Sequence, residues 1–322
     1  LRNSKDFSNI YSNFKNKFKS YKKKSFVIAV SGGPDSLGLV ALSNMYNSEN
    51  KISFKYVLVN HNIRKNSSSE AKKVENLLRR QNIKLDIINN YKPISKNIQG
   101  EARNARYKLL TEYCRKKNIK NLVTAHNLED QVETFLMRLS RGSGLKGLSA
   151  MKPLSNINSK VDLYRPLLDV KKKYLIKISK SIFGTYFKDP SNKNTNYLRT
   201  KIRSLKKPIE NSGIKYEQIF RSIQNLSSSK NTLDKYLDKI FKDLIKKTKG
   251  EILINFVKYK RLGKDTKISL INESIKQLKN NYYDLRSKKV DNLINNLEKK
   301  EFKKSTLGGC IFFKKNGNLC LK

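Results

Sequence analysis

Short apolar runs alternate with segments of helical periodicity through the first half of the chain. Continuous apolar stretches, typical of buried strands, lie at residues 25–31, 52–59, 85–88, 122–125 and 163–168. Apolar side chains at helical spacing predict helices at residues 37–45, 67–81, 98–117, 129–140 and 171–182. Five strands alternating with helices predict an α/β fold with a doubly wound parallel five-stranded sheet that carries helices on both faces.

The pattern changes beyond about Lys206. One helix is predicted at residues 218–247, with Gly250 just after its end, and two more at 268–279 and 283–297. Strands at 310–313 and 319–321 flank Asn316-Gly317, a pair typical of a tight hairpin turn. We therefore expect a large N-terminal catalytic domain, a helical segment and a small α+β C-terminal domain, at residues 1–207, 208–250 and 251–322.

The composition is strongly basic. The chain has 70 Lys and Arg residues against 26 Asp and Glu residues, a formal net charge of +44. This excess favours a polyanionic partner such as nucleic acid, with a compositional bias toward Lys, Asn and Ile as the alternative. No apolar run reaches the ~18–20 residues that cross a bilayer, so no membrane partner is expected. Three scattered cysteines without a Cys-x-x-Cys pair argue against a zinc ribbon or an iron–sulfur cluster, and favour a reducing compartment.

The turn after the first predicted strand has the composition of an anion site. It reads Ser31-Gly32-Gly33-Pro34-Asp35-Ser36. The glycines let backbone amides approach an anion closely, and the helix that follows adds the positive end of its dipole. Ser31 and Ser36 supply hydroxyl groups, and the Asp35 carboxylate suits a magnesium ion beside phosphates. The lysine of the GxxxxGK[ST] loop of ordinary nucleoside triphosphatases is missing here.

The only two histidines of the chain follow predicted strands. His61 lies in Asn60-His61-Asn62-Ile63-Arg64 after the second strand, and His126 follows the fourth. The carboxyl ends of parallel strands share one edge of a sheet, where α/β proteins bind their ligands. We therefore expect His61 and His126 on the same rim as the Ser31 turn.

Two predicted helices carry pairs of like charges three residues apart. Arg103 and Arg106 share a helix face, which suits phosphate or carboxylate binding, with a solvated basic face as the alternative. Asp130 and Glu133 also share a face and could bind a cation or an amine. The alternative for this pair is a stabilising interaction of acids with the helix dipole.

Together, these motifs resemble the tRNA(Ile)-lysidine synthetase family of PP-loop ATPases. The resemblance covers residues 26–203. It rests on the order of the Ser31–Ser36 loop, His61-x-x-Arg64, Gly100-Glu101 through Tyr107, Thr124 through Thr134 with Arg141-Gly-Ser-Gly144, Arg165-Pro-Leu167, Asp189-Pro-Ser-Asn192 and Arg199 through Arg203. Asn127 stands where a second histidine is common in the family, and Lys188 where an acid often precedes the Asp-Pro-Ser-Asn element.

The resemblance implies a ligase that uses ATP and Mg²⁺. It implies that the C2 oxygen of the first anticodon cytidine of tRNA(Ile) with a CAU anticodon is adenylated, and that the ε-amine of free lysine then displaces AMP. The roles implied for single residues are catalytic for Asp35, Arg106, His126 and Asp130; ATP-binding for Ser31, Gly32, Gly33, Pro34, Asp35 and Ser36; magnesium-binding for Asp35; and substrate-binding for His61, Arg64, Glu101, Arg103, Asp130, Glu133, Arg199 and Arg203.

Two other functions remain open from the sequence. One is another PP-loop enzyme that modifies tRNA, such as a thiolase, which would usually carry cysteines near the loop. The other is a non-catalytic RNA-binding protein. That function predicts the loss of Asp35, Ser36 or the acidic helix, and all of them are present. The resemblance leaves a homodimer possible, and it implies the cytoplasm or an organelle of bacterial descent as the compartment.

Overall fold

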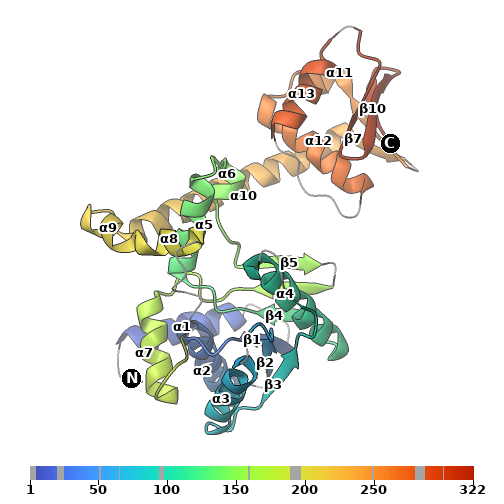
Figure 1. Ribbon diagram of the computed structural model, residues 1–322. Coiled ribbons are helices and arrows are strands. Elements are labelled where there is room, and N and C mark those ends of the chain that lie inside the picture. Colours follow the sequence, from blue (N-terminus) through green and yellow to red (C-terminus); the bar gives the residue numbers. More distant parts are fainter. Residues whose placement is uncertain are drawn as a thin grey trace. The chain divides into compact units, whose positions relative to one another are not determined.

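The chain forms two compact units, residues 1–227 and 228–322, which are described in turn. The computed structural model describes residues 5–19, 25–50, 52–64, 66–93, 98–158, 160–188, 197–248, 250–279, 287–299 and 301–322 (Figure 1). None of the helices in these ranges combines the length and the apolar character needed to cross a membrane.

The first unit is built on a six-stranded sheet. Its strands run in the order β3-β2-β1-β4-β6-β5. Their bounds are β1 (Ser25–Val30), β2 (Ser53–Asn60), β3 (Leu85–Asn89), β4 (Asn121–Val123), β5 (Leu154–Asn158) and β6 (Val161–Tyr164). The five expected strands are confirmed and are parallel, although β6 begins before the predicted residues 163–168. The antiparallel edge strand β5 was missed, because Leu154-Ser-Asn-Ile-Asn158 is short and mostly polar and resembles a loop.

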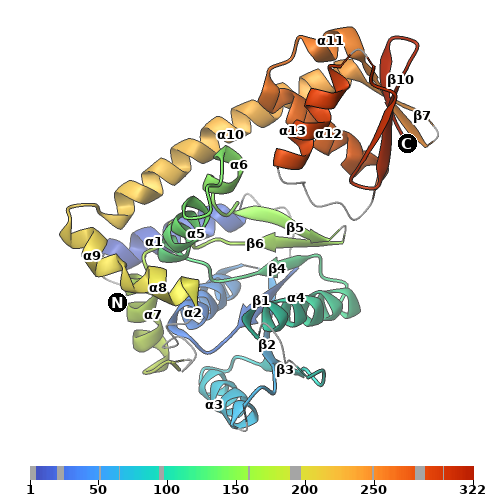
Figure 2. The same ribbon diagram turned by 45° about the horizontal axis from the view of Figure 1, so that its top comes forward.

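Helices cover both faces of this sheet, as predicted. The helices of the first unit are α1 (Lys5–Lys19), α2 (Pro34–Glu49), α3 (Ser67–Arg79), α4 (Ile98–Lys116), α5 (Leu128–Leu139), α6 (Leu145–Leu148), α7 (Lys172–Phe183), α8 (Leu198–Ser204) and α9 (Lys206–Asn211). Apolar residues of α1, α2, α3 and α7 share one core with β1 and β2. Leu110, Tyr113 and Cys114 of α4 pack on the opposite face (Figure 2).

The strand order reverses beside β1. From β1 the chain moves outward through β2 and β3 on one side, then returns to place β4 on the other side of β1. Val27 and Ile28 of β1 pair in register with Leu122 and Val123 of β4. The segments that leave the carboxyl ends of β1 and β4 therefore lie on either side of the switch point, where α/β sheets bind ligands.

A glycine lets α7 approach α2 closely. A Cβ atom built on Gly38 would lie 3.1 Å from Cδ2 and 3.4 Å from Cα of Leu175, which is fully buried in the contact. The two helices therefore meet nearly backbone to backbone, one turn beyond their first residues. This contact places the first turn of α7 beside the first turn of α2.

A smaller helical cluster follows the sheet. Leu128 and Val132 of α5 pack with Tyr216 and Ile223 of α10 (Tyr216–Leu244). This packing keeps the first turns of α10 with the first unit, so the two compact units divide within α10, between Ser227 and Ser228. The boundaries after residues 207 and 250 that the sequence predicts stay predictions.

The second unit combines helices with an antiparallel sheet of strand order β7-β8-β11-β10-β9. Its elements after α10 are β7 (Ile245–Thr248), β8 (Glu251–Asn255), α11 (Phe256–Lys260), α12 (Lys264–Leu278), α13 (Ser287–Leu297), β9 (Lys304–Leu307), β10 (Cys310–Lys315) and β11 (Asn318–Leu321). Asn316 and Gly317 have φ angles of 47° and 73°, which confirms the predicted tight hairpin turn. Ile252, Ile271 and Phe312 lie in its fully buried core.

We predict that Gly38→Val destabilises the first unit by about 1–3 kcal/mol, because the added branched side chain must push Leu175 away from α2. Thermal unfolding of the full chain measures this effect. Asn47→Val is the matched control, since it places the same side chain on an exposed position of the same helix. Equal melting temperatures for the two variants would contradict the close helix contact.

Candidate active site

The loop between β1 and α2 is shaped by its own side chains. The Ser36 hydroxyl accepts a hydrogen bond from the Ser31 backbone N–H at 3.1 Å and donates one to the Gly33 carbonyl at 3.0 Å. Gly32 has a φ of 76°, and a Cβ there would lie 2.5 Å from Cγ2 of Val74, so only glycine fits. Pro34 then begins α2 directly. The loop therefore presents a helix N-terminus at the carboxyl edge of the sheet.

Asp35 lies in the first turn of α2, and its two carboxylate oxygens have different surroundings. Its Oδ2 pairs with Nζ of Lys172 at 3.2 Å. Burial raises the pKa of this carboxyl, and Lys172 opposes that effect by stabilising the charged form, while the nearby Asp130 adds to the rise. Oδ1 is buried and has no hydrogen-bond partner among the described residues. An oxygen in this state is open to a ligand that supplies positive charge.

A network of asparagines sets the position of His61. Asn60 at the end of β2 donates to Oδ1 of Asn89 in β3 at 3.0 Å, and Asn62 donates to the Asn90 carbonyl at 3.0 Å. These bonds join the ends of two strands and hold His61 between them. Nε2 of His61 accepts a hydrogen bond from Nε of Arg106 at 3.3 Å. Burial, together with the Arg106 charge, lowers the pKa of His61 to about 4.

His126 follows β4 within a group of arginines. Its Nδ1 lies 2.9 Å from the Thr124 hydroxyl. Burial lowers the pKa of His126 to about 3, and the charges that add to this effect belong to Arg165, Arg103, Arg199 and Arg106. The imidazole is therefore neutral at physiological pH, and the positive charges that surround it come from these arginines.

The acidic pair on α5 is engaged by α8. Arg199 donates to Oδ1 of Asp130 at 2.6 Å and to Oε2 of Glu133 at 2.8 Å, and Arg203 donates to Oε1 of Glu133 at 2.7 Å. Burial alone would lower the pKa of Arg199, but Asp130 and Glu133 outweigh it and leave that pKa raised. Asn127 and Asp130 exchange hydrogen bonds at 3.1 and 3.0 Å in a capping box that orients the Asp130 side chain.

The predicted residues are thus largely gathered on one rim. The structure brings together the loop, His61, His126, Arg103, Arg106, Asp130, Glu133, Arg199 and Arg203. Arg64 lies instead on the exposed turn before α3, where it pairs with Glu70 at 3.6 Å, and Glu101 lies in the first turn of α4. The Asp-Pro-Ser-Asn element lies outside the described residues.

Two basic residues of this rim were not assigned a role from the sequence. Arg165, which is only 9% exposed, donates to the Lys152 carbonyl at 2.9 Å, and its Nε is buried without a partner in the described part of the chain. Lys172 pairs with Asp35. The Arg165-Pro166 pair was noticeable as a motif, but Lys172 is one of three consecutive lysines in a lysine-rich chain and has no distinguishing local signal.

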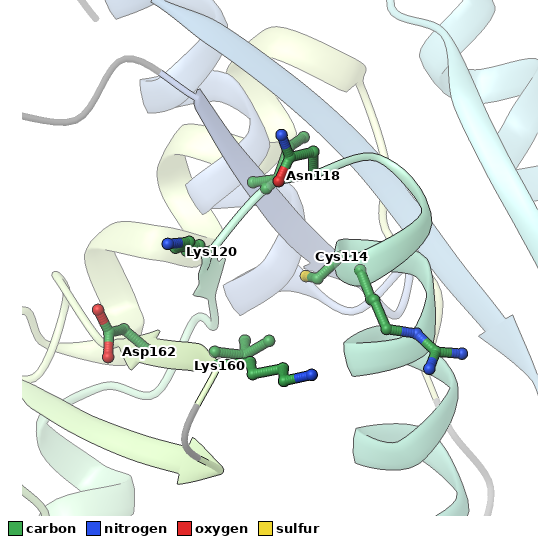
Figure 3. A pocket seen from close by; sticks show the side chains of 8 residues that line it. Cys114, Asn118, Lys120, Lys160 and Asp162 are labelled. Carbon is green, nitrogen blue, oxygen red and sulfur yellow. The ribbon is translucent and has the colours of Figure 1, made fainter.

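The described residues of the first unit line hollows at both edges of the sheet. One, of about 380 Å³, lies on the rim and includes His61, Asn62 and Tyr91. The other, of about 350 Å³, is lined by Cys114, Lys120, Lys160 and Asp162 (Figure 3). Because β4 and β6 begin beside it, this second hollow lies at the amino edge of the sheet, away from the loop. The loop and the two histidines predicted as site residues lie at the opposite, carboxyl edge of the sheet.

Comparison with known proteins shows the family of this chain. A model of the PP-loop domain family matches residues 7–208. The tRNA(Ile)-lysidine synthase of Wolbachia pipientis wMel is 33% identical over 307 residues, which cover 94% of this chain and 71% of that protein. The chain belongs to the tRNA(Ile)-lysidine synthase family. The predicted resemblance is confirmed, and the PP-loop domain makes this an ATP-binding protein.

Other relatives of this lysidine synthase family member support the assignment. The tRNA(Ile)-lysidine synthase of Rickettsia akari is 30% identical, over 93% of this chain and 69% of its own length. Among solved structures, the U34-tRNA thiolase NcsA from Methanococcus maripaludis superposes with a TM-score of 0.58 at 17% identity, covering 69% of this chain and 80% of that one. This likeness confirms the fold.

The lowered pKa of His126 predicts a pH-dependent stability. Above pH 6.5 the imidazole is neutral in the folded and unfolded chain and contributes nothing. Between pH 6.5 and about 3 the unfolded chain binds a proton that the folded chain does not, so stability falls as the pH falls. At pH 5 this penalty is about 2 kcal/mol.

Urea unfolding at pH 7.5 and pH 5 measures the effect. We expect the variant His126→Asn, which keeps a polar partner for Thr124, to lose less stability than the parent protein over this interval. Equal losses for the two proteins would contradict a buried, neutral imidazole.

Proposed function

We propose that this chain joins the ε-amine of free lysine to C2 of the first anticodon cytidine of an isoleucine tRNA with a CAU anticodon, with ATP converted to AMP and pyrophosphate. Similarity to lysidine synthases over nearly the whole chain supports the ligase assignment. The observation that carries the proposal is that an anion-binding loop and a buried acidic pair, one group for a triphosphate and one for an amine, lie on the same rim.

The first step would use the loop and the arginines. The C2 oxygen of the cytidine attacks the α-phosphorus of ATP, and the bond to the β-phosphate oxygen breaks, which releases pyrophosphate. The backbone amides of Gly32 and Gly33 and the hydroxyls of Ser31 and Ser36 would hold the phosphates. Arg106, held by its hydrogen bond to His61, would neutralise charge as it develops on the α-phosphate. His126, being neutral, would act as a hydrogen-bond donor rather than as a cation.

The donor set also fits a magnesium ion. Mg²⁺ is usually held by one or two carboxylates together with substrate phosphates and water, and the buried, unpartnered Oδ1 of Asp35 is a ligand of this kind. The described residues hold no group of three or more metal-ligating side chains, so a dedicated protein cage for a metal is not among them. When bound, the ion would offset phosphate charge as ATP is split.

The second step would use the acidic pair. Asp130 and Glu133 are the carboxylates best placed to receive the amines of lysine, and Arg199 and Arg203 now occupy them. The amines of the substrate would take the place of the guanidinium groups. A carboxylate would accept a proton from the ε-ammonium, since the amine must be neutral to attack C2 and expel AMP.

The positive charge of the chain suits an RNA substrate. Lys and Arg contacts to phosphates provide affinity that falls with rising salt, while the target base must leave its stack to reach the rim. The exposed Tyr236 on α10 is one aromatic side chain available for such contacts. We infer a compartment that holds tRNA, either the cytoplasm or an organelle of bacterial descent.

A thiolase of the same fold is the second candidate, and the cysteines disfavour it. All three are buried: Cys114 beside the hollow at the amino edge of the sheet, and Cys310 and Cys320 in the second unit. Burial raises the pKa of Cys114 to about 12, which leaves it protonated at physiological pH. A sulfur-transfer enzyme needs a reactive thiolate or a cysteine-held cluster at the ATP site.

A lysine-incorporation assay tests the proposal. The full chain is incubated with ATP, Mg²⁺ and labelled lysine, with a CAU-anticodon isoleucine tRNA transcript as substrate and the methionine tRNA of the same anticodon as control. We expect label and AMP with the isoleucine tRNA alone. Pyrophosphate release without label would indicate a different nucleophile, and neither signal would favour an RNA-binding protein.

We predict that Asp130→Asn and Glu133→Gln each raise the apparent KM for lysine by about 10-fold or more, because each removes a charge-assisted hydrogen bond. The KM for ATP should change much less. Glu49→Gln, which removes a surface carboxylate paired with Lys15, is the matched control. Thermal unfolding checks that the variants fold, and an unchanged lysine KM in both folded variants would refute the assignment of the pocket.

A further inference from the structure

Lys172 occupies an unusual position for a lysine in this chain. It is the first residue of α7, and its ammonium group reaches across to Oδ2 of Asp35 at 3.2 Å. Asp35 is the second residue of α2, directly after the loop of glycines. The ammonium group therefore lies at the mouth of the anion-binding loop, although the residue comes from a distant part of the sequence.

The backbone around Lys172 is held from two sides. Its N–H donates to Oε2 of Glu129 at 2.8 Å, which caps the start of α7 from α5. One turn later, the contact between Leu175 and Gly38 fixes α7 against α2. Lys172 contacts Asp35, and three residues later in both helices Leu175 contacts Gly38. This double attachment fixes the backbone position from which the Lys172 side chain reaches the loop.

The loop itself lacks a cation. Ordinary phosphate-binding loops end in a lysine that reaches the terminal phosphates of the nucleotide, and residues 31–36 contain none. We propose that Lys172 supplies this missing ammonium group from α7 and binds the β- and γ-phosphates of ATP, and then the pyrophosphate product. This inference rests on the proposed use of ATP, and it adds a substrate-binding residue to that function.

The pairing with Asp35 agrees with such a role. Without nucleotide, an aspartate at the mouth of an anion site would repel phosphates, and the Lys172 ammonium group neutralises it. When pyrophosphate enters, the same group can turn from Asp35 to the phosphate oxygens, because the lysine side chain is long and flexible. The competing interpretation is that Lys172 is only the counterion of Asp35 and never touches phosphate.

The affinity of the full chain for inorganic pyrophosphate, measured by titration calorimetry, separates these interpretations. The variants are Lys172→Met, Asp35→Asn and the double variant, with Lys173→Met as the matched control because Lys173 is exposed on the same helical turn. Binding is measured with Mg²⁺ and again with a chelator, so that the carboxylate of Asp35 cannot act through a metal.

We expect Lys172→Met to weaken pyrophosphate binding about 10- to 100-fold in both conditions, as expected for the loss of a charge-assisted hydrogen bond to phosphate. The same loss should appear when Lys172→Met is added to Asp35→Asn. Lys172→Arg should retain most of the binding, and Lys173→Met should bind like the parent protein. The affinity for AMP, which carries no β-phosphate, should be the same in Lys172→Met and in the parent protein when it is measured by the same calorimetry.

The proposal is overturned if adding Lys172→Met to Asp35→Asn has no effect, since Lys172 is then only a counterion. It is also overturned if Lys172→Met and Lys173→Met weaken pyrophosphate binding equally. The loss would then reflect the lower net positive charge of the protein and not a contact made by Lys172. A melting temperature is recorded for every variant, and Lys172→Gln replaces Lys172→Met if the latter does not fold. Because pyrophosphate binding needs neither tRNA nor lysine, a failure of lysine incorporation leaves this test intact.

Discussion

The pairing of β4 with β1 is the contact on which the rest of the site depends. It sets Leu122 and Val123 beside Val27 and Ile28 and reverses the strand order at that point. Because side chains beyond the ends of neighbouring parallel strands lie close together, the phosphate loop after β1 and His126 after β4 come to share one rim. α5 begins directly after His126, at the same rim. The position of Asp130 and Glu133 therefore depends on the two-residue pairing of β4 with β1 in the middle of the sheet.

Carboxylates are scarce in this chain, and their location is informative. There are 26 Asp and Glu residues against 70 Lys and Arg residues, yet Asp35, Glu129, Asp130 and Glu133 lie on one rim. Each is held by a cation from a helix that follows in sequence, either α7, α8 or α9. Buried negative charge of this kind is costly to keep without partners, so the paired cations are needed, and the clustering supports the proposed binding of a cationic substrate here.

The sequence predicted the parts of the fold that depend on local pattern. Buried strands are continuous apolar runs, and the loop of glycines and serines between a strand and a helix has a composition that few other structures require. The contacts of Arg199 with Asp130 and Glu133 could not be predicted in this way, since they join residues 69 and 66 positions apart. The position of Lys172 depends on how α2 and α7 pack at Gly38, which no local pattern shows. The strand β5 forms by pairing with β6 at the edge of the sheet, and its own short, polar sequence does not indicate a strand.

The contacts between α5 and α8 connect two binding events. In the proposed function, an amine that enters between Asp130 and Glu133 releases the guanidinium groups of Arg199 and Arg203, which become free to bind RNA phosphates. Conversely, a phosphate that captures these arginines empties the acidic pair for the amine. By thermodynamic reciprocity, each ligand then raises the affinity of the other by the same factor. In the proposed function, the four side chains would couple the two sites, so that amino acid and RNA bind together more readily than either binds alone.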